Sequence, residues 1–257
     1  MFNLAMAGTD RLRQITEAVR TAGSIGVAEL AGLTGASEMT IRRDLEVLAS
    51  QGVLERYRGG ARSLLLRGEE PPFALRAQEG TEVKRRIAVE AARLVADGES
   101  VVLDSGTTCL EVARLLAHRR LTVMPLSLHA VNALTEAPQL TLLVPGGRPR
   151  PGELALTGPL TQASLAALRF DTAIIGCCGL NAENGLTAYD LDDAAVKRAA
   201  IASARRVIAV AEAAKLSRTA LAFVAPAPAL HAVVTDDSAP DDRTEHLTAA
   251  GVTVRKV

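Results

Sequence analysis

The spacing of apolar residues changes once along the chain, and the change separates two parts. In the first part, residues 1–62, apolar residues recur every three or four positions, as they do in amphipathic helices. The pattern predicts a short helix over residues 27–33, with Leu30 and Leu33 facing inward. Gly35 follows it, and glycine readily adopts the positive φ that ends a helix. With one helix before it and another after it, this segment has the order of a helix-turn-helix.

The helix after the turn is predicted from its cap and from a narrow apolar stripe. Ser37 is a suitable N-cap, and the helix should extend to about Ser50, with Gly52 stopping it. At 100° per residue its main apolar side chains lie within about 60° of one another. They are Ile41, Leu45 and Leu48. Apolar residues at 53–54, followed by the glycines at 59–60, indicate a small hairpin. Three helices and a hairpin make a winged helix-turn-helix.

From residue 84 onward, helical patterns alternate with short apolar runs, which is typical of a mostly parallel sheet covered by helices. The predicted strands are 100–103, 121–125, 140–144, 172–176, 207–211, 220–223 and 232–235. The predicted helices are 84–96, 109–117, 128–134, 193–204 and 241–250. Between the two parts, residues 63–83 contain Pro71-Pro72 and several polar residues, which favours a linker. The sequence therefore predicts an α/β protein with an N-terminal winged helix-turn-helix (1–62), a linker (63–83) and a larger α/β sensor domain (84–257).

Composition excludes several classes of protein. With 257 residues, 48% of them hydrophobic, the chain can bury a sizeable core and is too apolar to be disordered. No apolar run approaches the roughly 20 residues of a membrane-spanning helix, and early charges argue against a signal peptide, so we expect a cytoplasmic protein without membrane partners. Three cysteines, two of them adjacent, suit neither a disulfide framework nor a zinc site. We expect no metal and no cofactor.

The outward face of the third helix carries side chains that suit the major groove of DNA. Arginine can donate two hydrogen bonds to guanine, and threonine or methionine can contact a thymine methyl group. Arginines of the hairpin would then meet the phosphate backbone. The candidate DNA-binding residues are Ser37, Met39, Thr40, Arg42, Arg43, Arg56 and Arg58. The alternative is an ordinary amphipathic helix with solvated arginines, because adjacent arginines are common on helices, and the zero net charge of the chain gives no hint of nucleic acid.

A second candidate site follows the predicted strand 100–103. The strand leads into Asp104, Ser105, Gly106, Thr107 and Thr108 and then into a helix. Such a turn directs backbone N–H groups and the positive end of the helix dipole toward one point, which suits a phosphate. No Gly-Lys-Ser/Thr follows, so nucleotide hydrolysis is unsupported. The alternative is that the two threonines simply cap the helix.

Other loops at the carboxyl ends of the strands should border the same crevice. Lysines there could place a point charge on a phosphate or donate to sugar hydroxyls, and they could equally be solvated surface residues. The candidates are Gly147, Arg148, Gly176, Asp193, Lys197 and Lys215.

These segments together resemble the DeoR family of bacterial transcriptional regulators. The resemblance rests on residues 37–45, on Arg58-Gly59-Gly60-Ala61, on residues 103–108, on Pro145-Gly146-Gly147 and on Gly185-Leu186-Thr187. It implies a winged helix that binds operators and a phosphosugar-isomerase-like domain that senses a phosphorylated sugar or a related metabolite. The chain departs from the family pattern at Asp193, where glutamate is usual, and at 212–215, where Glu-Ala-Ala-Lys replaces Asp-x-Ser-Lys, so two hydrogen-bonding groups are changed or lost.

Two functions fit these observations. The first is a repressor of a sugar or carbohydrate catabolic operon, released from operator DNA by its effector and assembled as a homodimer or higher oligomer. The second is an isomerase-like enzyme with an appended helical domain. Proton transfer needs a placed carboxylate or histidine. His129 is the nearest histidine, and Asp104 is better suited to bracing its loop. We therefore expect no catalytic residues and favour the repressor. A DNA-binding protein with a ligand-free pocket is a third alternative.

Overall fold

The computed structural model describes residues 2–50, 53–63 and 73–257. The chain forms two compact units, residues 1–79 and residues 80–257. The predicted stop at Gly52 and the prolines at 71–72 lie outside the described residues. Among the helices that the structure describes, none is long and apolar enough to cross a membrane.

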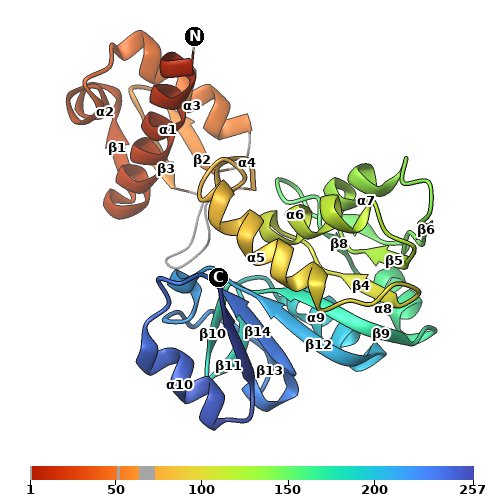
Figure 1. Cartoon of the computed structure of the whole chain (residues 1–257). Helices are drawn as coiled ribbons and strands as arrows, with labels where there is room; N and C mark the ends of the chain where they lie inside the picture. Colours follow the sequence, from red (N-terminus) through yellow and green to blue (C-terminus); the bar gives the residue numbers. More distant parts are fainter. Residues whose placement is uncertain (1, 51–52, 64–72) are drawn as a thin grey trace. The chain divides into compact units, whose positions relative to one another are not determined.

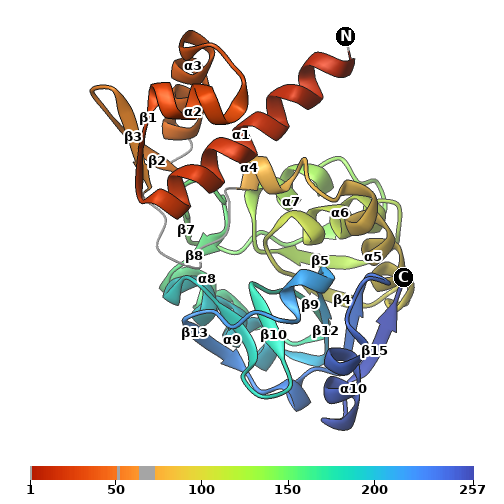
Figure 2. The ribbon, with the colours of Figure 1, turned by 90° about the vertical axis from the view of Figure 1, so that its left-hand side faces the viewer.

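The first unit contains three helices and a small antiparallel sheet (Figures 1 and 2). Its main helices are α1 (Phe2–Ala22), α2 (Val27–Thr34) and α3 (Glu38–Ser50), and a one-turn helix, α4 (Phe73–Arg76), follows them. The sheet has the order β1-β3-β2, with β1 (Ser24–Gly26), β2 (Leu54–Tyr57) and β3 (Gly60–Ser63). The predicted third helix and hairpin are confirmed. The strand β1, which pairs with β3, is an element that the sequence pattern did not predict.

The core of this unit confirms one predicted face and corrects another. Ile41, Leu45 and Leu48 are buried, as the stripe on α3 predicted. Leu33 was expected to face inward, and it is 62% exposed. The buried face of α2 begins at Val27 and continues three and four residues later, and Leu33 lies about 110° away from the middle of that face. Leu75 of α4 packs into the same core, so this part of the predicted linker belongs to the first unit.

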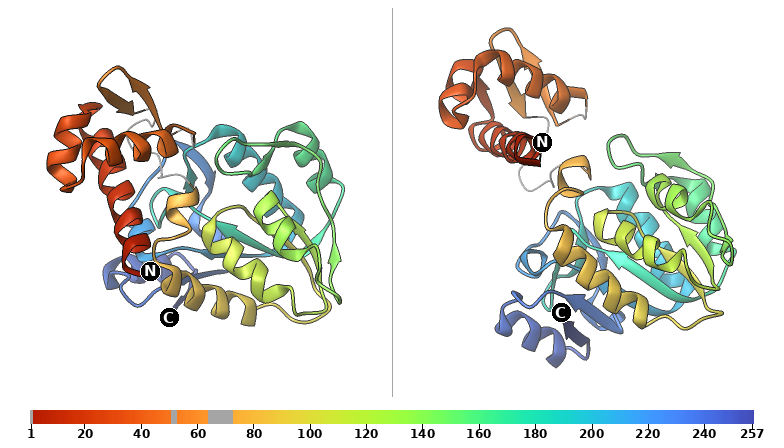
Figure 3. Two further views of the ribbon diagram at one scale, coloured as in Figure 1. Left: turned by 90° about the horizontal axis from the view of Figure 1, so that it is seen from above. Right: turned by 45° about the horizontal axis from the view of Figure 1, so that its top comes forward.

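The second unit is built on a seven-stranded parallel sheet (Figures 1 and 3). Its order is β15-β14-β12-β9-β4-β5-β6. The strands are β4 (Ser100–Leu103), β5 (Thr122–Pro125), β6 (Thr141–Leu142), β9 (Phe170–Gly176), β12 (Ala204–Val210), β14 (Ala232–Thr235) and β15 (Thr253–Lys256). The helices are α5 (Thr81–Arg93), α6 (Thr107–Leu116), α7 (Leu128–Leu134), α8 (Pro159–Ala166), α9 (Leu191–Ser203) and α10 (Asp241–Ala249). Two short 3-10 helices, η1 (Ala213–Lys215) and η2 (Ala227–Ala229), complete the helical part.

Successive residues of the central strands face opposite sides of this sheet. In β4, Val101 and Leu103 join one apolar cluster with α5, α6 and α7, whereas Val102 joins a second cluster with α8, α9 and α10. Both faces are therefore covered, as parallel sheets require. Because all seven strands are parallel, the loops that follow β4, β9 and β12 leave the sheet next to one another.

One predicted strand belongs elsewhere. The run near residues 220–223 forms β13 (Ala222–Ala225), which pairs antiparallel in a separate sheet with β11 (Gly185–Ala188) and β10 (Gly179–Asn181). A parallel neighbour needs a crossover of about a dozen residues or more, and the chain from β13 to β14 is shorter than that. The pair β7 (Arg148–Pro149) and β8 (Leu156–Thr157) was also not predicted.

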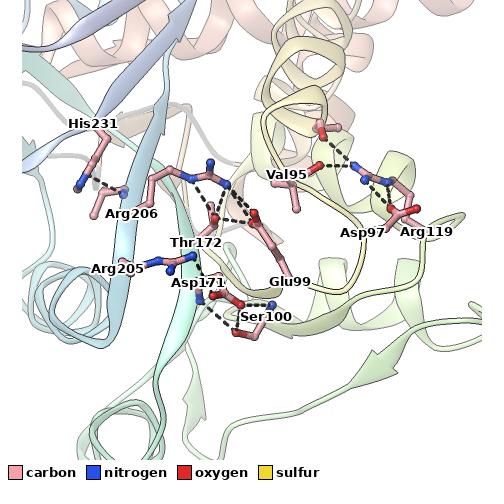
Figure 4. A network of polar contacts seen from close by, with 12 residues as sticks. Val95, Asp97, Glu99, Ser100, Arg119, Asp171, Thr172, Arg205, Arg206 and His231 are labelled. Atoms are coloured by element: carbon pink, nitrogen blue, oxygen red, sulfur yellow. Dashed lines mark hydrogen bonds and ion pairs between the residues drawn. The ribbon is translucent and has the colours of Figure 1, made fainter.

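Polar side chains tie the amino ends of three central strands together (Figure 4). Arg206 of β12 donates to Glu99, before β4, at 3.0 Å and also to Thr172 of β9. The N–H and hydroxyl of Ser100 both donate to Asp171 at 2.9 Å, and these bonds lower the pKa of Asp171. The amino ends of these strands are therefore held by internal contacts. The loops of the candidate site lie at the opposite, carboxyl ends.

Candidate functional site

The outward face of α3 presents the predicted DNA-binding residues to solvent. Ser37 caps the helix, because its hydroxyl accepts from the N–H of Thr40 at 3.2 Å. Met39 is 59% exposed, and Arg42 and Arg43 are also exposed. Arg42 forms an ion pair with Glu38, one turn before it, at 2.8 Å. In the described part of the chain, no hydrogen bond or ion pair holds the side chain of Arg43.

The hairpin β2–β3 carries the remaining two candidates. Arg56 is ion-paired with Glu46 of α3 at 2.7 Å, which links the strand to the helix. Arg58 lies exposed in the turn before Gly59. Its side chain, like that of Arg43, has no ion pair among the described residues. Among the described residues, Arg42 and Arg56 are therefore paired with carboxylates, whereas Arg43 and Arg58 have no ion pair.

An ion pair between α1 and α3 was missed by the sequence pattern. The guanidinium of Arg11 donates to the carboxylate of Asp44 at 2.6 Å, and Asp44 is buried. This partner raises the pKa of Arg11. Asp44 places a charge within the apolar stripe of α3, and a charge at such a position is the sequence signal that could have revealed the ion pair. The pair orients α3 and keeps a carboxylate away from its outward face.

At the carboxyl edge of the large sheet, the centre of the second candidate site is a buried lysine between two carboxylates. The ammonium of Lys197, on α9, contacts the carboxylate of Asp104 and lies 3.4 Å from that of Asp193. All three side chains are buried. Burial lowers the pKa of Lys197, but the two carboxylates outweigh this and raise it overall. The lysine therefore stays protonated, while burial, which outweighs the attraction of Lys197, raises the pKa of Asp104.

Asp104 also joins two neighbouring loops. The N–H of Gly176, at the end of β9, donates to its carboxylate at 2.9 Å. A Cβ at Gly176 would lie 3.1 Å from the carbonyl oxygen of Ser105, so the two loops approach too closely for a larger residue. The predicted bracing role of Asp104 is in agreement with these contacts.

The turn from Ser105 to Thr108 begins helix α6 without a side-chain cap. Gly106 occupies the N-cap position with a φ of 103°, which a glycine adopts without strain. Neither threonine caps the helix: Thr107 is its first residue and is buried, and Thr108 is half-buried. The first N–H groups of a helix lack partners within it. The first turn of α6 therefore has backbone N–H groups that no bond within the helix uses.

Three of the other predicted residues lie in two further segments, one at Gly147-Arg148 and one at Lys215. Gly147 has a φ of 134°, and the place of its missing side chain is taken by Thr161 of α8. Arg148 is exposed and lies 3.5 Å from Asp192, at the start of α9. Lys215 lies in η1, after β12, where burial and the charge of Arg218 lower its pKa to about 7. The structure thus brings Asp104, Gly176, Asp193 and Lys197 together through Asp104 and Lys197, whereas Gly147, Arg148 and Lys215 lie in the two further segments.

Of the two residues considered for proton transfer, Asp104 belongs to this cluster and His129 lies elsewhere. His129 lines a groove between α6 and α7 with His118 and Leu154, and burial lowers its pKa. Burial also raises the pKa of the Cys109 and Cys177 thiols, which disfavours thiolates.

A winged helix-turn-helix joined to an α/β unit with a polar cluster at its carboxyl edge defines a DNA-binding regulator with a sensing domain. The family model described as "DeoR-like helix-turn-helix domain" matches residues 11–65, and the one described as "DeoR C terminal sensor domain" matches residues 79–237. The chain belongs to the DeoR family of transcriptional regulators.

Relatives match over nearly the whole length. The putative aga operon transcriptional repressor of Escherichia coli O157:H7 is 33% identical, over 96% of this chain and 93% of its own. The glycerol-3-phosphate regulon repressor of Escherichia coli K12 is 31% identical, over 95% and 96%. A solved structure, ribose 5-phosphate isomerase A of Methanocaldococcus jannaschii, is 17% identical over 53% of this chain and 55% of that one, with a TM-score of 0.40. The expected family and fold class are confirmed.

Proposed function

We propose that this protein represses a carbohydrate or polyol-phosphate catabolic operon and releases its operator when a phosphorylated sugar or related metabolite binds. One chain contains both a helix, α3, with exposed arginines and a sheet edge with backbone N–H donors and a buried lysine. This combination is the observation that carries the proposal. The names of the relatives, which refer to an aga operon and to glycerol 3-phosphate, support the effector class. Because its proposed partner is operator DNA, its proposed location is the cytoplasm.

For DNA, we assign base contacts to α3 and backbone contacts to the wing. Arg43 and Met39 would enter the major groove, with Thr40 and Arg42 beside them and Ser37 at the helix start. Arg56 and Arg58 would contact phosphates, which add affinity without sequence preference. Winged helix-turn-helix proteins commonly bind two half-sites, so we also propose a homodimer or a higher homo-oligomer.

For the effector, charge divides the site into two subsites. In the cluster, the Lys197 ammonium is already paired with Asp104 and Asp193, which leaves little attraction for a phosphate and suits sugar hydroxyls, because carboxylates accept from hydroxyls and the ammonium donates to them. The uncapped start of α6, residues 105–108, and Lys215 suit the phosphate. Gly147 and Arg148 would border the bound molecule.

We propose that the chain is not an enzyme. An isomerase moves a proton between carbon atoms and needs a base. Lys197 is held protonated, Asp104 is held in an ion pair and by the N–H of Gly176, and His129 lines a different groove. An isomerase assay with ribose 5-phosphate and glucose 6-phosphate should therefore detect no turnover, and turnover would favour the enzyme alternative.

The test of the regulatory proposal is reciprocal binding. DNA flanking the gene and a panel of glycerol 3-phosphate, glucose 6-phosphate and fructose 6-phosphate would be titrated separately and together. A ligand that lowers DNA affinity must lose affinity by the same factor when DNA is bound. We expect this mutual weakening for at least one phosphate ester and none for glycerol, glucose or fructose. Equal affinities in both directions would contradict the proposal.

A further inference from the structure

The inference concerns Glu212, which lies at the end of β12 beside the first turn of α5. Its carboxylate oxygen Oε1 is 3.7 Å from the ammonium of Lys84, a residue of that turn. Lys84 is 3% exposed, so its charge is held inside the protein and needs a nearby counter-charge. Glu212 supplies that charge from a loop that is far away in sequence.

The second oxygen of the same carboxylate lies against Gly80. A Cβ at this position would be 2.9 Å from Oε2 of Glu212, and the φ of Gly80 is 56°, in the left-handed region. Gly80 is the N-cap of α5, whose amide end favours a negative charge. Glu212 therefore contacts both the cap and the first turn of α5.

Glu212 is also the residue that begins the turn carrying Lys215. The N–H of Lys215 donates to the carbonyl oxygen of Glu212 at 2.8 Å. The N–H of Ala213, the next residue, donates to the buried Asp236 at 2.6 Å. These bonds hold the backbone from Glu212 to Lys215 together as one short segment, so a displacement of the Lys215 backbone would strain its bond to Glu212.

The first residue of the second unit is Gly80, and Glu79 before it is the last residue of the DNA-binding unit. We infer that Glu212 is a positioning residue that transmits effector binding at the Lys215 turn to the start of α5, and through the Glu79–Gly80 peptide to the DNA-binding unit. This inference rests on the proposed function. It adds the route by which that site would control DNA binding.

The experiment uses the full-length chain with Glu212→Gln, which keeps the shape of the side chain and removes its charge. Effector affinity is measured by calorimetry with the three phosphate esters named above, and DNA affinity by fluorescence anisotropy with and without saturating ester. We expect both separate affinities to change by no more than about twofold. The effect of the ester on DNA affinity, about 5- to 150-fold for typical allosteric coupling, should fall close to one.

Glu90→Gln is the matched control. Glu90 lies on the same helix, is also largely buried as a side chain, and pairs with Arg255 at 2.7 Å, away from the helix start. It should retain the full effect of the ester. If Glu212→Gln retains it as well, the inference is wrong. If Glu212→Gln fails to fold because Lys84 loses its partner, the double variant Glu212→Gln/Lys84→Met, which removes both charges, takes its place with the same expected loss of coupling.

A double-mutant cycle, measured on four proteins without ligand, tests this inference separately from the proposed function. If none of the esters binds the parent chain, the proposed effector class fails, and the route is tested by mutation instead. Lys215→Met is introduced into the parent and into Glu212→Gln, and DNA affinity is measured for all four proteins. We expect the effect of Lys215→Met to be smaller by more than about twofold when Glu212 is changed. Equal effects in both backgrounds would overturn the inference.

Discussion

The ammonium of Lys197 contacts the carboxylate of Asp104 across 93 residues of sequence, and both side chains are buried. The contact joins α9 to the residue that follows β4, and β4 lies beside β9 in the sheet. Because Asp193 adds a second carboxylate, the cation has two counter-charges inside the protein.

Removing the cation should destabilise the sensing unit. Lys197→Met would leave Asp104 and Asp193 buried and facing each other, and breaking a buried pair by deleting one partner costs about 3–5 kcal/mol. Urea denaturation of the full-length chain, followed by circular dichroism, measures the loss. Lys256→Met, which removes a lysine from an exposed pair with Asp241, is the control and should change the transition little. A similar small effect of both substitutions would contradict the assigned role of Lys197.

Arg43 and Arg58, which have no ion pair among the described residues, should differ in what they do to DNA binding. Arg43→Ala should weaken binding to the specific site by about 1–3 kcal/mol and relax the preference at one base pair. Arg58→Ala should weaken binding to all sequences alike and reduce the slope of affinity against salt by about one unit. Salt titrations on specific and scrambled DNA distinguish the two. Equal loss on both DNAs for Arg43→Ala would show that α3 does not contact bases as proposed.

A negative charge at the start of α6 should abolish binding of a phosphate ester. Thr108 is the better position for this test, because it is half-buried whereas Thr107 is buried. Thr108→Asp places a carboxylate where the phosphate is proposed to lie, and aspartate is compatible with the first turn of a helix. The variant should still bind DNA and no longer release it on addition of the ester. Thr108→Asn, similar in shape and neutral, is the control. A normal response of Thr108→Asp would remove this turn from the site.

Effector binding should depend on pH through Lys215. Its pKa of about 7 means that the amine is largely neutral above that pH, and a bound phosphate dianion would draw a proton onto it. Affinity should then fall by up to about tenfold per pH unit from about pH 7.5 to about pH 9, where the phosphate itself no longer titrates. Calorimetry in buffers of different ionisation enthalpy would detect the proton uptake. Lys215→Arg, which stays charged, should bind with no such dependence.

The same lysine makes a separate prediction for stability. Its pKa is lowered in the folded chain from an ordinary value of 10.5, so between about 7 and 10.5 the unfolded chain binds more protons at this group. Its contribution to the free energy of unfolding therefore increases as the pH rises through that range. Lys215→Met should remove this increase. Identical pH profiles of urea denaturation for the parent and Lys215→Met would show that burial does not hold the amine neutral.

The sequence predicted those parts of the fold that depend on local patterns. The stripe of Ile41, Leu45 and Leu48 fixed the buried face of α3, and alternation of strands and helices fixed the parallel sheet. Leu33 was misassigned because an apolar residue near a helix end says little about which face the neighbouring helix covers. The strand β13 was assigned to the wrong sheet, since the pairing of a strand depends on the connections around it.

The sequence predicted which loops make up the candidate site, but it did not predict which side chains in them are in contact. Asp104, Gly176 and Lys197 were each named from the sequence, but nothing local shows that a lysine on α9 meets an aspartate after β4. The pairs Arg11–Asp44 and Lys84–Glu212 were not predicted for the same reason, because each joins residues far apart in the chain. A charged residue within an apolar stripe, as at Asp44, is the one local signal of such a pair.

The polar ties among Glu99, Thr172 and Arg206 have a practical consequence for protein engineering. They hold the central strands together at their amino ends, whereas every loop assigned to the effector lies at the carboxyl ends (Figure 4). Loops after β4, β9 and β12 can therefore be exchanged or randomised without disturbing these fastenings. If the connection from Glu212 to α5 is left intact, such a library is a starting point for transcriptional biosensors of new metabolites. The operator sequence and the reporter promoter would stay unchanged.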